Sequence, residues 1–221
     1  MVITAIERQK KRNQRVSIFV DGEFVLGIHE NVLLKLGLRK GDTIDEKMMR
    51  SIESDEEFNS AKDKALRLMS YRLRSEKELR KRLRENDYPP SLIDKTVEHL
   101  RSLRLVDDRA FARAFVHDLI LKKSAGKSLL QRELRQKGVS NEIIVETLNE
   151  MVGMEDEYER ALTAASAILK RLRTSRKSTD AKKQQQRITA FLMRRGFDFS
   201  IINRVIRKLL APSQFSEDLD E

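Results

Sequence analysis

Leu83-Arg-Glu-Asn-Asp-Tyr-Pro-Pro-Ser-Leu-Ile93 is the stretch that decides the fold, because two altered copies of it follow in the same chain. The copies are Leu134-Arg-Gln-Lys-Gly-Val-Ser-Asn-Glu-Ile-Ile144 and Leu192-Met-Arg-Arg-Gly-Phe-Asp-Phe-Ser-Ile-Ile202, at offsets of 51 and then 58 residues. Each copy reads as the end of one helix, a turn and the start of another. A period of this length is typical of helical-repeat proteins, in which one unit buries its apolar stripe against its neighbours.

The turn inside the motif sets the register of the repeats. Gly138 and Gly196 occupy the same position, where a helix commonly ends in a left-handed residue. Asp87 stands at that position in the first copy, and Asp adopts the left-handed conformation more readily than most residues. The apolar residue that follows each turn is predicted to pack back on the helix that has just ended.

Apolar residues at helical spacing predict three helices in each unit. In the first unit the expected core positions are Ala65, Leu66, Met69, Leu73, Leu79, Leu83, Ile93, Val97, Leu100 and Leu103. Ser91 and Asp94 are spaced as a capping pair for the third helix of this unit.

The N-terminal segment has a different pattern. Two short apolar runs in residues 15–28 flank Asp21-Gly22, a dipeptide that favours a tight β-hairpin turn. Residues 2–6 could add a third strand. Residues 31–36 are predicted to form a short helix ended by Gly37, and a linking helix is expected to begin near Asp45.

We therefore expect a mainly α protein with three tandem three-helix, helix-turn-helix-like repeats in an elongated array, after a small β-hairpin-containing module. The predicted boundaries are 1–57 for the module and linking helix, 58–108, 109–153 and 154–210 for the repeats, and 211–221 for a disordered acidic tail.

Charge is distributed unevenly along the chain. The net charge is +10, but residues 58–210 contain 35 basic and 20 acidic residues, so the repeats carry all of the excess. This excess favours a polyanion, or a partner with an acidic face. There is no cysteine, and charges interrupt every apolar run. We therefore expect a soluble, cytoplasmic, monomeric protein without a membrane partner.

Basic residues gather on the first two helices of each unit, which predicts a basic strip. The candidate binding residues are Arg72, Arg74, Arg80, Lys81, Arg84, Lys122, Lys123, Lys127, Arg132, Arg135, Lys182, Lys183, Arg187, Arg194 and Arg195. For any one of them, a solvated helix face is the alternative interpretation.

Signs of catalysis are weak. Residues 124–128 end like a phosphate-binding loop, but they lack its first glycine and the strand before it. Asp107 and Asp108 could hold Mg²⁺, yet an N-cap for the next helix explains them more simply. The three histidines have no spacing suited to a metal. We expect no enzyme activity, no cofactor and no metal.

Three segments resemble the RecX regulatory proteins. They are Ala65-Leu-Arg-Leu-Met-Ser-Tyr-Arg-Leu-Arg-Ser-Glu-Lys-Glu-Leu79, Leu105-Val-Asp-Asp-Arg-Ala-Phe-Ala112 and Glu133-Leu-Arg-Gln-Lys-Gly-Val139. They follow one another in the family's order, whereas the third unit matches more loosely. Residues 1–57 are similar to the N-terminal extension of longer members in character only.

The resemblance implies a regulator of RecA, the bacterial recombinase, that acts in homologous recombination, DNA repair and the SOS response. Family members bind RecA filaments, and typically inhibit the ATPase and strand exchange of RecA; the basic strip would then contact RecA or single- and double-stranded DNA. The main alternative is a direct, largely non-sequence-specific DNA-binding protein of helix-turn-helix type. The third helix of the first unit has a mixed acidic and basic surface, which argues against reading of the major groove.

Overall fold

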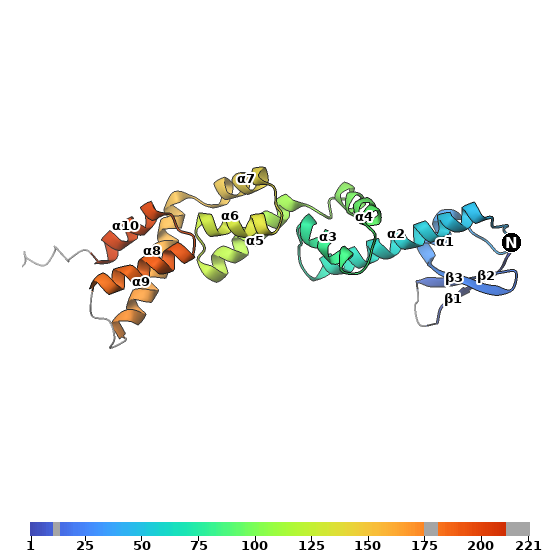
Figure 1. The fold of residues 1–221 in the computed structure, drawn as a ribbon, viewed down its shortest axis with the longest axis horizontal. Coiled ribbons are helices and arrows are strands. Elements are labelled where there is room, and N and C mark those ends of the chain that lie inside the picture. Colours follow the sequence, from blue (N-terminus) through green and yellow to red (C-terminus); the bar gives the residue numbers. More distant parts are fainter. Residues whose placement is uncertain (11–13, 175–180, 211–221) are drawn as a thin grey trace, which may run out of the picture. The chain divides into compact units, whose positions relative to one another are not determined.

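The computed structural model describes residues 1–10, 14–174 and 181–210, and it contains two compact units. The first unit comprises Met1–Arg74 and Glu78–Val106, and the second comprises Ser75–Lys77 and Asp107–Glu221. The predicted acidic tail lies outside the described residues. Figure 1 labels the elements of both units, and the predicted fold class, mainly helical after a small antiparallel sheet, is confirmed.

A three-stranded antiparallel sheet opens the first unit. Its strands β1 (Ile3–Arg8), β2 (Arg15–Val20) and β3 (Glu23–His29) lie in the order β1-β2-β3. Asp21 and Gly22 have φ values of 50° and 89°, which confirms the predicted hairpin turn. Alternate side chains of the strands point into one core, because successive residues of a strand face opposite sides of the sheet.

Two helices complete this core. Helix α1 (Glu30–Leu36) ends at Gly37 with a φ of 63°, and α2 (Glu46–Tyr71) begins after Asp45. The Asp45 carboxylate accepts a hydrogen bond of 2.6 Å from the backbone N–H of Met48, so it caps the helix as a side chain at this position often does. Val32 of α1 and Ile52 of α2 are buried against the strands.

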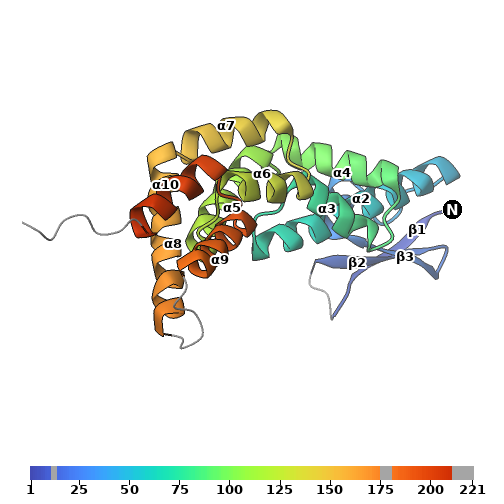
Figure 2. The same ribbon diagram turned by 60° about the vertical axis from the view of Figure 1, so that its left-hand side comes forward.

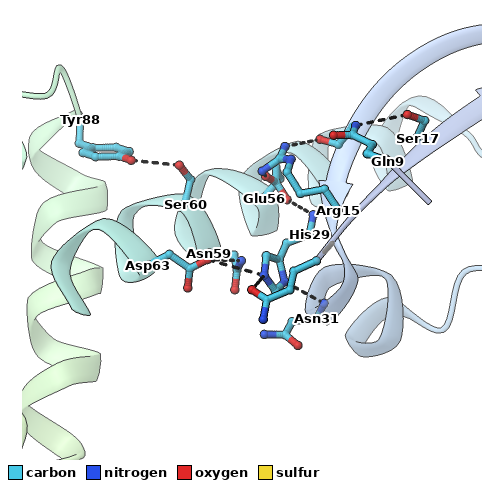
Figure 3. A network of polar contacts seen from close by, with 12 residues as sticks. Gln9, Arg15, Ser17, His29, Asn31, Glu56, Asn59, Ser60, Asp63 and Tyr88 are labelled. Atoms are coloured by element: carbon cyan, nitrogen blue, oxygen red, sulfur yellow. Dashed lines mark hydrogen bonds and ion pairs between the residues drawn. The ribbon is translucent and has the colours of Figure 1, made fainter. Parts of the chain in front are cut away.

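A polar network attaches the sheet to α2 (Figure 3). Glu56 lies 2.6 Å from the Arg15 guanidinium and accepts a bond of 2.6 Å from the backbone N–H of His29. The same helix continues into the first repeat, where the hydroxyls of Ser60 and Tyr88 are 3.0 Å apart. The linking helix and the first helix of the repeat are therefore one continuous helix, and the predicted boundary at residue 57 falls inside it.

The first repeat consists of the C-terminal half of α2, α3 (Glu76–Arg84) and α4 (Pro90–Ser102). Its core contains Ala65, Leu79, Leu83, Ile93, Val97 and Leu100. Three predicted core positions are wrong, because Leu66, Leu73 and Leu103 are exposed. Leu73 and Leu103 lie just beyond the ends of α2 and α4, where the helical period no longer places a side chain in the core.

The predicted capping pair of α4 is also wrong. The helix begins at Pro90, so Ser91 lies inside it, and the cap residue Pro89 offers no side-chain hydrogen bond. The nitrogen of Pro at the first helical position carries no hydrogen, so it needs no such acceptor. Asp94 instead accepts a bond of 2.5 Å from Arg80 of α3.

The second unit holds two further repeats. The second repeat is α5 (Asp108–Lys123), α6 (Lys127–Gln136) and α7 (Asn141–Met151), and the third is α8 (Met154–Thr174), α9 (Ala181–Arg194) and α10 (Phe199–Leu210). Each has its own buried cluster. In the third repeat every helix packs on the other two, as Figure 2 shows for α8, α9 and α10.

The turns of the repeated motif have the predicted conformation. Asp87, Gly138 and Gly196 have φ values of 63°, 84° and 77°. The residues that follow the two glycines, Val139 and Phe197, are buried in the cores of their own repeats, as expected of an apolar side chain behind a left-handed helix end.

Acidic residues cap helices in the second unit. Asp107 caps α5 by accepting from the backbone N–H groups of Arg109 and Ala110, which confirms its predicted role. Asp108 accepts a bond of 2.8 Å from the N–H of Glu76, and Glu157 of α8 accepts one of 2.7 Å from the N–H of Lys127. The first N–H groups of a helix have no partner within the helix, so each carboxylate satisfies a donor that is otherwise orphaned.

The turn at residues 124–128 has a packing role. The N–H of Gly126 donates to the carbonyl of Arg195 at 2.8 Å, and the N–H of Ser128 donates to the carbonyl of Gly196 at 3.1 Å. A side chain on Gly126 would overlap the backbone of Gly196. Glycine is needed here because two backbone segments are in contact. This packing role explains the glycine that makes the turn resemble a phosphate-binding loop.

A candidate basic interface

Several of the predicted cations are held by carboxylates in the first unit. Arg72 bonds to Glu78 at 2.9 Å, Arg80 bonds to Asp94 at 2.5 Å, and Lys81 lies 3.9 Å from Glu85. Such surface pairs contribute at most about 1 kcal/mol each to stability, but they lower the positive charge that a partner meets.

Arg74 is half-buried and is bonded to the backbone. Its Nε donates to the carbonyl of Leu68 at 2.9 Å, so the side chain ties the loop after α2 back to that helix. Burial, together with the nearby charge of Arg72, lowers the pKa of the Arg74 guanidinium. Arg74 thus has a structural task in addition to any contact with a partner.

In the second repeat four of the predicted cations also have partners. Lys122 bonds to Asp118 at 2.9 Å and lowers the pKa of that carboxylate by donating to it. Arg132 lies 3.9 Å from Glu133. The other two cations bond to amides, with Lys127 at 3.2 Å from Asn149 and Arg135 at 3.1 Å from Asn141.

The third repeat differs from the first two. Lys182, Lys183, Arg187 and Arg194 are exposed on α9, a helix without an acidic residue. Arg195 follows it, with its guanidinium 4.5 Å from the centre of the Phe191 ring. Arg204 of α10, which was not among the predicted residues, bonds to Glu155 at 2.9 Å and stacks on Tyr158.

Five of the predicted cations are exposed and have no side-chain hydrogen bond or ion pair within residues 1–10, 14–174 and 181–210. They are Arg84, Lys123, Lys183, Arg187 and Arg194. An unpaired, exposed guanidinium or ammonium can bind an anion without first breaking an internal contact. These five residues are the strongest binding candidates that the structure offers.

The register of the repeats refines the predicted strip. Lys81 and Arg84 of α3 correspond to Arg132 and Arg135 of α6, so two basic positions recur in the first two repeats. The same positions in α9 are Ala190 and Met193. The cations of α9 stand at other positions of their helix, and a strip continuous through all three repeats stays a prediction.

Sequence reasoning overlooked the carboxylates that neutralise part of the strip. The spacing of Asp118 and Lys122, four residues apart on one helix, was a usable signal. The pair of Arg80 and Asp94 joins two helices, so only the packing of α3 against α4 reveals it.

The described part of the chain contains neither a metal-binding cluster nor a helix that could cross a membrane. It holds no group of three or more His, Cys, Asp or Glu side chains that could bind a metal ion. Within the same residue ranges, every helix is too short or too polar to cross a membrane.

Comparison with known proteins places these features in a family. Four models match in order along the chain, described as the regulatory protein RecX N-terminal domain for residues 1–45 and the RecX first, second and third three-helix domains for residues 61–100, 107–148 and 155–206. The chain belongs to the RecX family. The match extends to the N-terminal module and to the third repeat, which had seemed the less similar parts.

Relatives in the family cover nearly the whole chain. A regulatory protein RecX from Clostridioides difficile (strain 630) is 34% identical over 95% of this chain and 96% of its own length. One from Bacillus velezensis is 32% identical over 93% of this chain and 76% of its own length. A crystal structure of regulatory protein RecX has a TM-score of 0.77 at 29% identity and covers 92% of this chain and 98% of that chain. The chain is thus similar to the RecX regulatory proteins in sequence, domain order and fold.

Proposed function

We propose that this protein is a non-enzymatic regulator that binds RecA and RecA–DNA filaments through the basic faces of its repeats. On binding, it inhibits the ATPase and the strand exchange of the recombinase. The observation that carries this proposal is the ordered match of four RecX domains along residues 1–206, in relatives that are called regulatory proteins.

The charges support a polyanionic or acidic partner. RecA filaments assembled on DNA combine protein surfaces with phosphates, and both can attract an exposed cation that has no internal partner. Arg84 and Lys123 belong to this group, one on the second helix of the first repeat and the other at the end of α5. Because each repeat has its own core, the chain can present several small basic surfaces instead of one pocket.

Binding to DNA with and without RecA tests the proposal directly. The affinity of the full-length chain is measured for a labelled oligonucleotide alone and for the same oligonucleotide coated with RecA, at physiological salt. We expect clearly tighter binding to the coated form, together with inhibition of strand exchange. Equal affinity for the two forms, without inhibition, contradicts the proposal and favours the second candidate, a DNA-binding protein without sequence preference.

Substitutions at the unpaired cations disturb the fold less than substitutions at the residues of the family signature. Reversing the charge at Arg72, Arg74 or Arg80 would also break internal contacts. Arg84→Glu with Lys123→Glu changes two exposed side chains that hold no such contact, so the fold should survive. We expect this double variant to weaken inhibition while its circular dichroism spectrum stays that of the wild type. Undiminished inhibition by the folded variant would remove these two residues from the interface.

A further inference from the structure

Basic residues predominate in the third repeat from Arg160 onward. From Arg160 to Leu210 the sequence has fourteen basic residues and two acidic ones, Asp180 and Asp198. Asp180 lies outside the described residues. The Asp198 carboxylate accepts a bond of 2.9 Å from the backbone N–H of Ser200, so it is engaged in starting α10. The other four acidic residues of the repeat, Glu155, Asp156, Glu157 and Glu159, stand in the first two turns of α8, and α9 itself contains none.

Three of these cations lie along one line on α9. At about 100° per residue, Lys183, Arg187 and Arg194 fall within about 40° of one another around the helix axis. All three are exposed, and the opposite face carries the buried residues Ile188 and Leu192. At 1.5 Å per residue the stripe is about 16 Å long. We name these three residues the α9 stripe.

Local stability does not account for the whole stripe. Lys183 stands in the first turn of α9, where the positive end of the helix dipole disfavours a cation. An intrahelical carboxylate could offset that cost, but α9 contains none. Arg194 is in the last turn, where a cation is favourable, so the dipole explains this residue alone.

The stripe is also specific to the third repeat. Arg187 corresponds to Glu78 in α3 and to the buried Leu129 in α6, and Arg194 corresponds to Glu85 and Gln136. With 14 residues, α9 is longer than α3 and α6, and the extra turn brings Lys183. The architecture shared by the repeats therefore does not require these cations.

We propose that the α9 stripe binds the phosphate backbone of nucleic acid. This inference rests on the proposed function, in which the protein contacts DNA as well as RecA, and it assigns that contact to the third repeat. The exposed Ala190 lies at the edge of the stripe and is small enough to admit a phosphate. The exposed Gln186 lies beside Ala190, one helical turn earlier, and can donate a hydrogen bond to phosphate. Protein interfaces are centred on large aromatic or apolar anchors. No such residue lies on the line of the three cations, and the exposed Met193 lies about 100° around the helix from Arg194.

The salt dependence of the binding affinity measures how many phosphates the stripe contacts. Each phosphate neutralised by the protein contributes about 0.9 to the slope of log K against log salt for a duplex, and about 0.7 for a single strand. Loss of three contacts should therefore lower the slope by about 2 to 3. The measurement uses DNA alone, so it is independent of any effect on RecA.

The experiment compares three full-length proteins on single-stranded and duplex oligonucleotides over a series of NaCl concentrations. The test variant is Lys183→Gln with Arg187→Gln and Arg194→Gln. The control variant, Arg50→Gln with Arg101→Gln and Arg113→Gln, removes the same charge at exposed residues that are paired with Glu46, Glu98 and Glu150. Circular dichroism and thermal unfolding establish that both variants are folded.

We expect the stripe variant to lose affinity and slope, and the control variant to keep the slope of the wild type. An unchanged slope in the stripe variant, or an equal loss in the control, overturns the inference. Retained DNA binding with lost binding to RecA filaments overturns it as well, and assigns the stripe to an acidic protein surface. If the wild type instead fails to prefer RecA-coated DNA, the proposed function fails while the stripe can still be shown to bind phosphates.

Discussion

The same turn ends the second helix in all three repeats, yet its central residue is Asp87 in the first and glycine in the other two. All three residues have a left-handed backbone, so the φ angle alone does not explain the difference. Asp87 is exposed. By contrast, an added Cβ would overlap the Lys77 side chain at Gly138 and the Leu129 backbone at Gly196. Glycine is therefore required where another chain segment packs on the turn.

The largest expected effect in this comparison is that of Gly196→Ala. The substitution adds strain at a φ of 77° and forces the methyl group against backbone atoms of Leu129, which cannot rotate away. Together these should destabilise the contact by about 3 kcal/mol or more. Hydrogen exchange of the amides in α6, α9 and α10 measures the loss of protection.

Gly37→Ala is the matched control for that experiment. Gly37 has a φ of 63° and nothing within 4 Å of an added Cβ, so only the backbone strain of about 1 kcal/mol should appear. An equal loss of protection in the two variants would mean that backbone conformation, and not packing, selects glycine at the turn.

Removal of the Glu157 carboxylate should have the next largest effect. Glu157 is 5% exposed and accepts from the N–H of Lys127, next to the contact of Gly196. Glu157→Ala leaves this donor unsatisfied and should cost about 1 to 3 kcal/mol. Glu157→Gln keeps an acceptor oxygen and should cost less. The exchange rate of the Lys127 amide reports the difference, and equal rates in the two variants would contradict the capping role.

Gly138→Ala should cost less than Gly196→Ala. The added methyl group meets the Cβ, Cγ and Cδ atoms of Lys77. A change of rotamer moves Cγ and Cδ away, whereas Cβ stays in place, so only part of the overlap can be relieved. We expect about 1 to 2 kcal/mol, measured by exchange in α6 and α7. Lys77→Ala in the same chain shortens the obstructing side chain and should recover part of the loss. No recovery would show that the Cγ and Cδ atoms of Lys77 do not set the cost, which then comes from strain at the turn and from the Cβ of residue 77.

The smallest expected effect is that of Asp87→Gly. Glycine adopts the left-handed conformation without the penalty of a Cβ, so the change should leave the first repeat unaltered or stabilise it by up to about 1 kcal/mol. Urea unfolding followed by circular dichroism provides the measurement. Clear destabilisation would mean that the Asp87 side chain makes a contribution that its exposure does not suggest.

Much of the fold could be predicted because its signals are local. The hairpin at Asp21-Gly22, the cap at Asp107 and the left-handed turns at Gly138 and Gly196 each follow from the preferences of neighbouring residues. The prediction failed at Leu66, Leu73 and Leu103, since periodicity alone does not say where a helix ends or which side of it meets a partner. It failed at Ser91 and Asp94 because the helix begins one residue earlier, at Pro90, and because Arg80 of another helix is the partner of Asp94.

The sequence predicted which cations belong to the candidate interface, but not which of them lack an ion-pair partner. The composition shows that the excess of positive charge lies in residues 58–210. The register of the repeats shows that most of the candidate cations lie on the second helix of each repeat. Whether a cation is available depends on carboxylates from other elements, as with Arg80 and Asp94. The α9 stripe was nevertheless visible in the sequence, because a helix without acidic residues cannot pair its own cations.

The sequence by itself determined the family, the three repeated motifs, the hairpin and the excess of positive charge, since each is a property of neighbouring residues or of composition. The tertiary structure alone decided that α2 carries both the N-terminal module and the first repeat, and that Asp108 and Glu157 cap helices distant in the chain. It also decided which of the predicted cations have no ion-pair partner among the described residues. The physical reason is that burial and ion pairing depend on atoms close in space, and the chain order does not state which atoms those are.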